Sequence, residues 1–297
     1  MAARRARPLL RNSRPMAAEP SDIDWDEAWK ARQRRRRHAD DLEFWEKRAP
    51  SFAKTAGTSP YAREFLDRSD VHDGETVFDM GCGSGTLALP LARRGVEVWA
   101  CDFSPTMLEL MMRRAELEGT DSLIHPVELA WGESWEGKGL PVCDVAFASR
   151  SVATDDMRAA LEKLERQASR LVCVTLGTDS SPRSDETLLR AAGRPREIYS
   201  DYVYAMNILW QMGRQPSLSY IRSQRASTFE SPEQALEKTC QIIEATPEER
   251  DRLAAYTREH LVQVEGEDGE RRWSYDHTRV TSWAFISWES PLERNPS

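Results

Sequence analysis

The sequence predicts an α/β protein in which helices cover both faces of a mostly parallel β-sheet. Two observations carry this prediction. Between residues 74 and 177, short apolar runs alternate with stretches that have the amphipathic pattern of helices. The chain has 297 residues, of which 40% are hydrophobic and 30% charged, so it can bury a substantial core without disulfides or metal ions.

Five short apolar runs have the length and composition of buried β-strands. They fall at residues 75–80, 96–101, 123–129, 143–148 and 171–176. Helices are expected between the runs, near residues 86–94, 105–118 and 155–168. Ser104 and Pro105 mark the start of the second helix, because serine caps a helix and proline fits its first turn. This alternation predicts parallel strands joined by helical crossovers.

Helices and strands are also expected outside this central region. A helix is expected over residues 22–48, where acidic residues fill the first turn and apolar residues recur every three or four positions. Residues 217–229 and 280–288 alternate as strands do, and helices are expected between them near residues 232–244 and 247–262. The two late strands therefore fit the end of the same sheet, separated by a helical insertion.

Composition excludes several classes of protein. The formal net charge of −8 argues against a general nucleic-acid binder, and no apolar run is long enough for a membrane-spanning helix. The five cysteines include no CxxC pair and the five histidines have no metal-ligand spacing, so no metal site is predicted. Scattered cysteines suit a reducing compartment, and we expect the protein in the cytoplasm.

A glycine-rich turn follows the first predicted strand and leads into a helix. It begins at Asp79 and reads DMGCGSGT. Alternate glycines let the backbone turn sharply and remove side chains where a ligand contacts the main chain. Such a turn at the carboxyl end of a central parallel strand is where open α/β sheets bind ligands. Thr86 stands where the dinucleotide fingerprint has its third glycine, so the turn favours an amino-acid moiety, whose ammonium group Asp79 can reach.

Candidate ligand-binding residues also follow the second, third and fourth strands. Asp102 lies 21 residues after Gly81, where a carboxylate can accept hydrogen bonds from both hydroxyls of a ribose. Phe103 beside it can pack on an adenine ring. Glu133 follows the third strand and can accept a hydrogen bond from the adenine amino group, while Ser149 ends the fourth strand.

Structural interpretations of the same residues stay open. Glu133 is equally well explained as a solvated loop acid, and Trp135 as a core residue rather than a wall for the adenine. Cys82 is interpreted as a small loop residue rather than a nucleophile, because no histidine stands near it in the sequence. The glycines alone could make a tight turn with no ligand, but the spacing to Asp102 favours a binding site.

These motifs resemble those of the class I S-adenosylmethionine-dependent methyltransferases. The resemblance covers roughly residues 40–180 and is carried by residues 77–92 (VFDMGCGSGTLALPLA), 98–110 (VWACDFSPTMLEL) and 144–151 (DVAFASRS). It implies a Rossmann-like sheet of seven strands with a reversed last hairpin, and S-adenosyl-L-methionine as the cofactor. Residues 44–54 (FWEKRAPSFAK) look like the lead-in that helps to cover the cofactor in small-molecule members of this family. The residues expected to bind the cofactor are Asp79, Gly81, Cys82, Gly83, Gly85, Asp102, Phe103, Glu133, Ser134 and Ser149.

With this resemblance, the chain is expected to divide into four segments. Residues 1–20 are expected to form a disordered basic arm, and residues 21–55 a helical cap at the amino-terminal end. Residues 56–182 are expected to form the Rossmann-like core that binds S-adenosylmethionine. Residues 183–297 continue the sheet, carry the helical insertion and supply the acceptor side.

The expected reaction is methyl transfer to a small molecule that the sequence does not name. Because a sulfonium already activates its methyl group, alignment is the main requirement, and no catalytic residue is singled out. The fourth strand ends in ASRS rather than in the Asn/Asp-Pro-Pro-Tyr pattern associated with methylation of planar exocyclic amines. Candidates for the acceptor side are Arg150, Asp155, Asp156, Tyr199, Tyr202 and Tyr204.

Two alternatives remain from the sequence. Arg32 and the run Arg34–Arg37 would suit an RNA- or ribosome-associated methyltransferase, although a charge run is more often a solvated helix face. The second alternative is a non-catalytic module that binds S-adenosylmethionine, because a fold does not fix a function. The sequence predicts neither the oligomeric state nor the acceptor atom.

Overall fold

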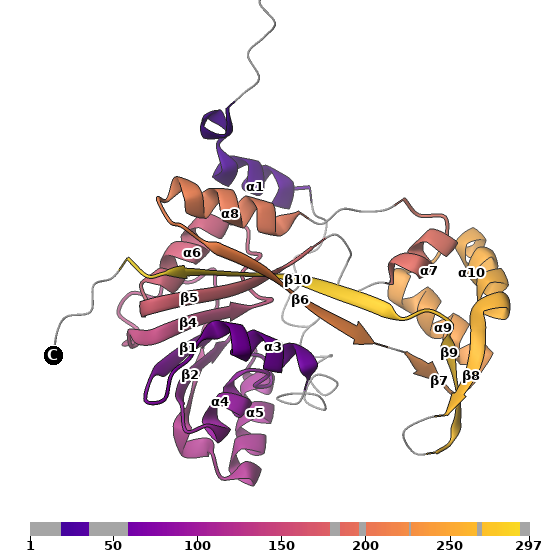
Figure 1. The fold of residues 1–297 in the computed structure, drawn as a ribbon, viewed down its shortest axis with the longest axis horizontal. Helices are drawn as coiled ribbons and strands as arrows, with labels where there is room; N and C mark the ends of the chain where they lie inside the picture. Colours follow the sequence, from indigo (N-terminus) through magenta and orange to yellow (C-terminus); the bar gives the residue numbers. More distant parts are fainter. Residues whose placement is uncertain are drawn as a thin grey trace, which may run out of the picture.

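Two β-sheets organise the part of the chain that the computed structural model describes (Figure 1). The described residues are 19–35, 59–178, 185–195, 200–225, 227–265 and 269–291. The larger sheet has seven strands in the order β3-β2-β1-β4-β5-β10-β6. These are β1 (Thr76–Met80), β2 (Glu97–Asp102), β3 (Ile124–Glu128), β4 (Cys143–Ser149), β5 (Ala168–Gly177), β6 (Ser217–Arg225) and β10 (Arg279–Glu289). Strands β1 to β5 pair in parallel and β10 is antiparallel to both β5 and β6, which confirms the predicted sheet.

Helices cover both faces of the seven-stranded sheet (Figure 1). One face carries α3 (Pro60–Ser69), α4 (Ala88–Arg93) and α5 (Pro105–Glu118), and the other α1 (Trp25–Gln33), α6 (Met157–Glu165) and α8 (Asp201–Gln211). On the first face Phe65 packs edge-on against Phe147 and Phe285, with ring centroids 4.9 and 5.2 Å apart. On the second, Trp29 of α1 is fully buried and donates from its indole nitrogen to the Thr154 carbonyl at 2.8 Å. Each face thus has its own apolar core.

Short sequence signals fix where the helices begin. Ser59 and Ser104 cap α3 and α5 by accepting hydrogen bonds from Ala62 N and Met107 N, and a proline occupies the first turn of both helices. The helix predicted over residues 105–118 is thereby confirmed, since α5 has the same bounds. Two single turns of 3-10 helix complete this part of the chain, η1 (Pro20–Asp22) and η2 (Asp121–Leu123).

The insertion between β6 and β10 forms a lobe beside the larger sheet (Figure 1). It contains the expected helices, α9 (Pro232–Ile243) and α10 (Pro247–His260), and is joined by α7 (Glu186–Ala191). The lobe also holds a three-stranded sheet in the order β7-β9-β8. Its strands are β7 (Thr228–Phe229), β8 (Leu261–Glu265) and β9 (Arg271–Tyr275). Phe229, Leu253 and Tyr275 belong to a separate buried cluster, so the lobe has a core of its own.

Two expectations about element bounds need correction. The run 217–229 is not one strand, because β6 ends at Arg225 and β7 pairs with β9 in the smaller sheet. The helix expected from residue 22 begins at Trp25, where Asp24 caps it, and the described helix ends at Gln33. Residues 36–58, which include the rest of that expected helix and the lead-in at 44–54, lie outside the described residues.

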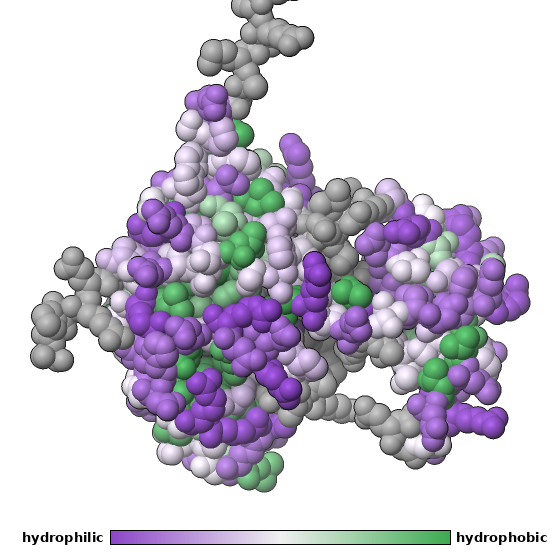
Figure 2. Space-filling model, viewed as in Figure 1, coloured by the Kyte–Doolittle hydropathy of each residue, from purple (hydrophilic) through white to green (hydrophobic). Residues whose placement is uncertain are grey.

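Hydrophilic side chains cover most of the lobe in the view of Figure 2. This agrees with the burial of the lobe's apolar side chains in a cluster inside it. Among the described residues, none of the helices combines the length and the apolar character that crossing a bilayer requires. The division of the chain at residues 20, 55 and 182 stays a prediction.

Candidate functional site

The glycine-rich turn connects β1 to α4 and is anchored to the end of β2. Gly81 N and Cys82 N both donate to the Cys101 carbonyl, at 2.7 and 3.0 Å. Gly81, Gly83 and Gly85 all have a left-handed backbone, with φ between 55° and 87°. A Cβ on Gly81 would also lie 2.3 Å from the Ser151 Cβ. Only glycine satisfies both the backbone conformation and the close approach of the segment after β4.

Asp102 at the end of β2 contacts this turn directly. Its Oδ2 accepts from Gly83 N at 2.8 Å and its Oδ1 accepts from Ser104 N at 3.0 Å. Burial raises the pKa of Asp102, while its backbone N–H donors act in the opposite direction. A carboxylate offers about four acceptor positions, so Asp102 retains capacity for hydroxyl donors of a ligand. The two motifs, 21 residues apart in sequence, thus meet at one place.

Asp79 is the most unusual group at the site. Only 1% of the residue is exposed, and neither carboxylate oxygen has a hydrogen-bond partner among the described residues. Burial, and to a lesser extent the neighbouring Asp102 carboxylate, raises the pKa of Asp79 from 3.8 to about 7, against the opposing effect of Arg150. A buried carboxylate without a partner is costly, and a cationic ligand group would offset that cost. Asp79 therefore fits the ammonium group of an amino-acid moiety.

Three further residues, Cys82, Phe103 and Ser84, lie in the glycine-rich turn or beside Asp102. The Cys82 thiol is buried and donates to the Gly83 carbonyl, and burial raises its pKa well above the ordinary value. It stays protonated at neutral pH, which argues against a nucleophilic role. Phe103 is half-buried beside Asp102. Ser84 was not among the predicted site residues, yet its hydroxyl is buried and has no partner within the described parts of the chain.

The residues after β3 are already engaged with their neighbours. Glu133 accepts from Ala130 N and from Lys138 Nζ, both at 2.6 Å, and Lys138 is the main cause of its lowered pKa. Ser134 is exposed, and its hydroxyl accepts from Glu136 N at 3.3 Å. Trp135 is buried and packs near Phe78, with ring centroids 5.7 Å apart, as the structural interpretation expects. A contact from Glu133 to adenine and a role of Ser134 in cofactor binding stay predictions.

Ser149 belongs to a hydroxyl cluster that the sequence did not predict. The Tyr61 hydroxyl lies 2.7 Å from both Ser149 Oγ and Thr175 Oγ1. Tyr61 comes from α3, 88 positions before Ser149 in the chain, and no local pattern marks it. Ser151 Oγ donates to the Met80 carbonyl at 2.6 Å. The carboxyl ends of β1, β4 and β5 are thereby tied together beside the glycine-rich turn.

The other acceptor-side candidates differ in their surroundings. Asp156 caps α6 and pairs with Lys30 at 2.8 Å. Tyr204 lies edge-on to Trp29, 5.6 Å between centroids, and serves the packing of α8 on α1. Tyr202 lies edge-on to Tyr220 of β6, with centroids 6.1 Å apart. Asp155 is exposed, and Tyr199 lies outside the described residues.

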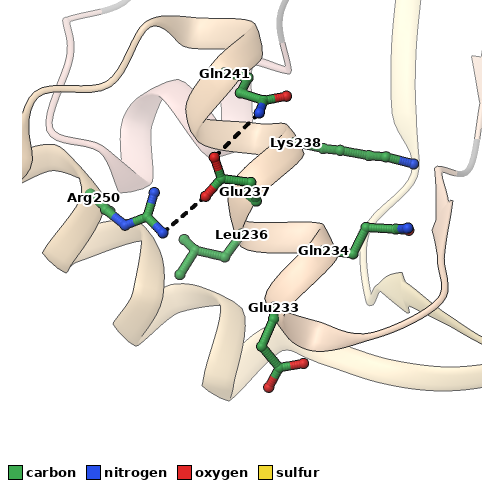
Figure 3. A pocket seen from close by; sticks show the side chains of 7 residues that line it. All are labelled: Glu233, Gln234, Leu236, Glu237, Lys238, Gln241 and Arg250. Atoms are coloured by element: carbon green, nitrogen blue, oxygen red, sulfur yellow. Dashed lines mark hydrogen bonds and ion pairs between the residues drawn. The ribbon is translucent and has the colours of Figure 1, made fainter.

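A surface groove in the lobe provides no competing site. It is lined by side chains of α9 and α10, and Glu237 at its centre accepts from Arg250 at 3.0 Å and from Gln241 at 3.2 Å (Figure 3). None of its lining residues comes from the strands that hold the glycine-rich turn. The carboxyl ends of β1, β2 and β4 remain the candidate site.

Comparison with protein families identifies one domain in this chain. Residues 77–169 match the family model of a methyltransferase domain. An uncharacterized protein of Haemophilus influenzae is 34% identical over 182 residues, which are 61% of this chain and 66% of that protein. A 23S rRNA (uracil(1939)-C(5))-methyltransferase of Shewanella amazonensis is 43% identical over 73 residues, 23% of this chain and 16% of that protein. This chain thus covers less than two thirds of either relative.

One solved structure can be superposed on most of this chain. The precorrin-6y C5,15-methyltransferase of Geobacter metallireducens is 11% identical, with a TM-score of 0.47. The match covers 76% of this chain and 87% of that one.

Proposed function

We propose that this chain is a class I S-adenosylmethionine-dependent methyltransferase that transfers the methyl group of S-adenosylmethionine to a small-molecule acceptor, in keeping with the methyltransferase-domain model that residues 77–169 match. The observation that carries the proposal is the contact between Asp102 and Gly83, beside the unpartnered carboxylate of Asp79. Together these groups offer acceptors for a ribose and for an ammonium, as the two ends of an adenosyl amino acid require.

The chain's own residues would hold and align the reactants. Asp102 accepts from ribose hydroxyls, and Asp79 faces the ammonium group. The backbone of Gly83 allows close approach of the ligand, since no described atom lies within 4 Å of a Cβ built on this residue. When bound, S-adenosylmethionine supplies a methyl group on a positively charged sulfur. Alignment beside the acceptor is then the main contribution of the protein.

A small-molecule acceptor is favoured over RNA by the surroundings of the arginines. Arg32 pairs with Asp201 at 3.2 Å, and Arg34 pairs with Glu27. Both side chains are thereby engaged with acids of the same chain, and the net charge is −8. An RNA-directed enzyme would bind RNA in a salt-dependent manner that is lost when these arginines become glutamate. The buried free thiols of all five cysteines support a cytoplasmic location.

The proposal is tested first by binding. Isothermal titration of the purified protein with S-adenosylhomocysteine should give saturable heat at micromolar ligand. Absence of heat at high micromolar concentrations would contradict it. Labelled S-adenosylmethionine incubated with a metabolite extract should then yield a labelled product in the presence of the protein. Cofactor binding without any product would instead favour a non-catalytic module.

The affinity for S-adenosylhomocysteine should depend on pH through Asp79. Only the ionised carboxylate attracts the ligand ammonium, and the pKa of Asp79 is about 7. Lowering the pH from 8 to 6 should therefore weaken binding roughly tenfold. In Asp79→Asn this dependence should disappear, whereas it should persist in Glu128→Gln, which changes an exposed acid. Calorimetry at the two pH values measures the affinity. An equal change of affinity with pH in Asp79→Asn and in the wild type would show that another group causes the pH dependence.

The same pKa has a consequence for the ligand-free protein. The folded state retains a proton that the unfolded chain releases above about pH 4, its ordinary aspartate pKa. The free energy of unfolding should therefore fall as the pH rises from about 4 to about 7 and level off above. Asp79→Asn should flatten this part of the profile.

A further inference from the structure

Arg150, the first residue after β4, has a backbone conformation that nothing local requires. Its φ is 62°, in the left-handed region, and its N–H donates to Thr175 Oγ1 at 3.0 Å. The other two described non-glycine residues with positive φ, Asp70 and Glu244, are the C-caps of α3 and α9, where this conformation is common. Arg150 caps no helix. Such backbone strain concentrates at functional sites.

The side chain of Arg150 rests on an aromatic platform. Its guanidinium carbon lies 4.3 Å from the centroid of the Tyr61 ring and 5.7 Å from that of Trp283. Tyr61 is itself fixed by Ser149 and Thr175. A stacked guanidinium uses its face for the ring and keeps its N–H edge for hydrogen bonds, in the geometry that binds an oxyanion through two parallel bonds.

No carboxylate of the described chain pairs with Arg150. Asp156, one of the partners that the sequence allowed, is engaged by Lys30 at 2.8 Å. Asp79 lies near enough for Arg150 to lower its pKa, yet forms neither an ion pair nor a hydrogen bond with it. The Arg150 side chain is exposed. The positively charged guanidinium of Arg150 is therefore held on the two aromatic rings, and its N–H groups are available to a ligand.

The Arg150 guanidinium lies toward β10 rather than toward Asp102, although Asp79 stays within electrostatic reach. In the sheet order, the glycine-rich turn and Asp102 follow β1 and β2, on one side of β4. Trp283 belongs to β10 on the other side, paired with Gly177 at the end of β5. We propose that Arg150 binds a carboxylate or phosphate group of the methyl acceptor, and that the acceptor is therefore an anionic small molecule. This inference rests on the proposed function and narrows its substrate class.

The test uses small anions on the complete protein saturated with S-adenosylhomocysteine. Benzoate and phenyl phosphate are the probes, and neutral benzamide is the matched ring without charge. In protein labelled with 15N-arginine, either anion should shift the Arg150 Nε signal saturably, and benzamide should not. Arg150→Gln should weaken anion binding at least tenfold, Arg150→Lys should weaken it less, and Arg113→Gln, an exposed arginine of α5, should leave it unchanged.

Three outcomes overturn the proposal. The first is undiminished anion binding by Arg150→Gln, and the second is equal binding of benzoate and benzamide. The third is a loss of S-adenosylhomocysteine affinity in Arg150→Gln that 5′-methylthioadenosine, which lacks the carboxylate, does not show. That result would assign Arg150 to the cofactor. Arg150→Gly, which suits the left-handed backbone, repeats the test if the glutamine variant does not fold. Failure of the wild type to bind S-adenosylhomocysteine would contradict the proposed function instead.

Discussion

Replacing Asp102 with alanine should weaken the binding of S-adenosylhomocysteine by about 100-fold. The substitution removes the proposed acceptor for two ribose hydroxyls and also the acceptor that holds Gly83 N at 2.8 Å. Hydrogen bonds to a charged group contribute about 1.5–3 kcal/mol each, and about 2.8 kcal/mol corresponds to a factor of 100. Isothermal titration calorimetry measures the change directly. Labelled product from a metabolite extract should be lost in parallel.

A neighbouring acid provides the matched control for this prediction. Glu128 is exposed and lies opposite Asp102 in the register of β2 and β3. Glu128→Ala removes one negative charge at the same level of the sheet, one strand away, and should change the affinity less than twofold. If both variants bind equally well, the ribose role of Asp102 is wrong. If both lose binding equally, the effect is one of net charge rather than of hydrogen bonding.

Gly81→Ala should reduce the free energy of unfolding by about 3 kcal/mol. The left-handed backbone costs a residue with a side chain about 1–2 kcal/mol, and overpacking adds about 1–3 kcal/mol. The added Cβ would meet the Ser151 Cβ at 2.3 Å and its Oγ at 2.6 Å. In a protein of this size the midpoint of thermal unfolding should fall by roughly 5 °C. Differential scanning calorimetry measures both quantities.

Two companion variants separate the causes. Gly83→Ala has the same backbone strain, with φ at 55°, but no described atom within 4 Å of the new Cβ, so it should be destabilised by only about 1–2 kcal/mol. Gly81→Ala combined with Ser151→Gly removes the atoms that collide and should recover part of the loss. Equal destabilisation by Gly81→Ala and Gly83→Ala would show that Ser151 moves away from the new Cβ at little cost in free energy.

The sequence predicted those features that local patterns encode. The strands β1, β4 and β5 have nearly continuous apolar runs because both of their faces are covered, and α5 and α6 begin at the capping residues Ser104 and Asp156. The convergence of Asp102 with the glycine-rich turn was also predictable, because adjacent parallel strands bring their carboxyl ends together. These features depend on short spacings within the chain.

The remaining features depend on contacts between distant segments. Tyr61 reaches Ser149 and Thr175 only through the docking of α3, and its own neighbours in sequence indicate a helix and nothing more. The short β7 has two residues, too few for a recognisable alternation. The local pattern of Glu133 was compatible with both a ligand and a loop role, and its partner Lys138 is visible only once the loop is folded.

The ribbon formed by β6 and β10 joins the lobe to the rest of the molecule. Residues 283–289 of β10 pair with β5, but residues 279–282 pair only with β6 among the described strands. Before residue 283, on the side of the lobe, the connection is thus a two-stranded overhang, and such a ribbon has little stability of its own and twists readily. Twisting of this ribbon can therefore move the insertion, and the α7 packed on it, without changing the geometry around the glycine-rich turn.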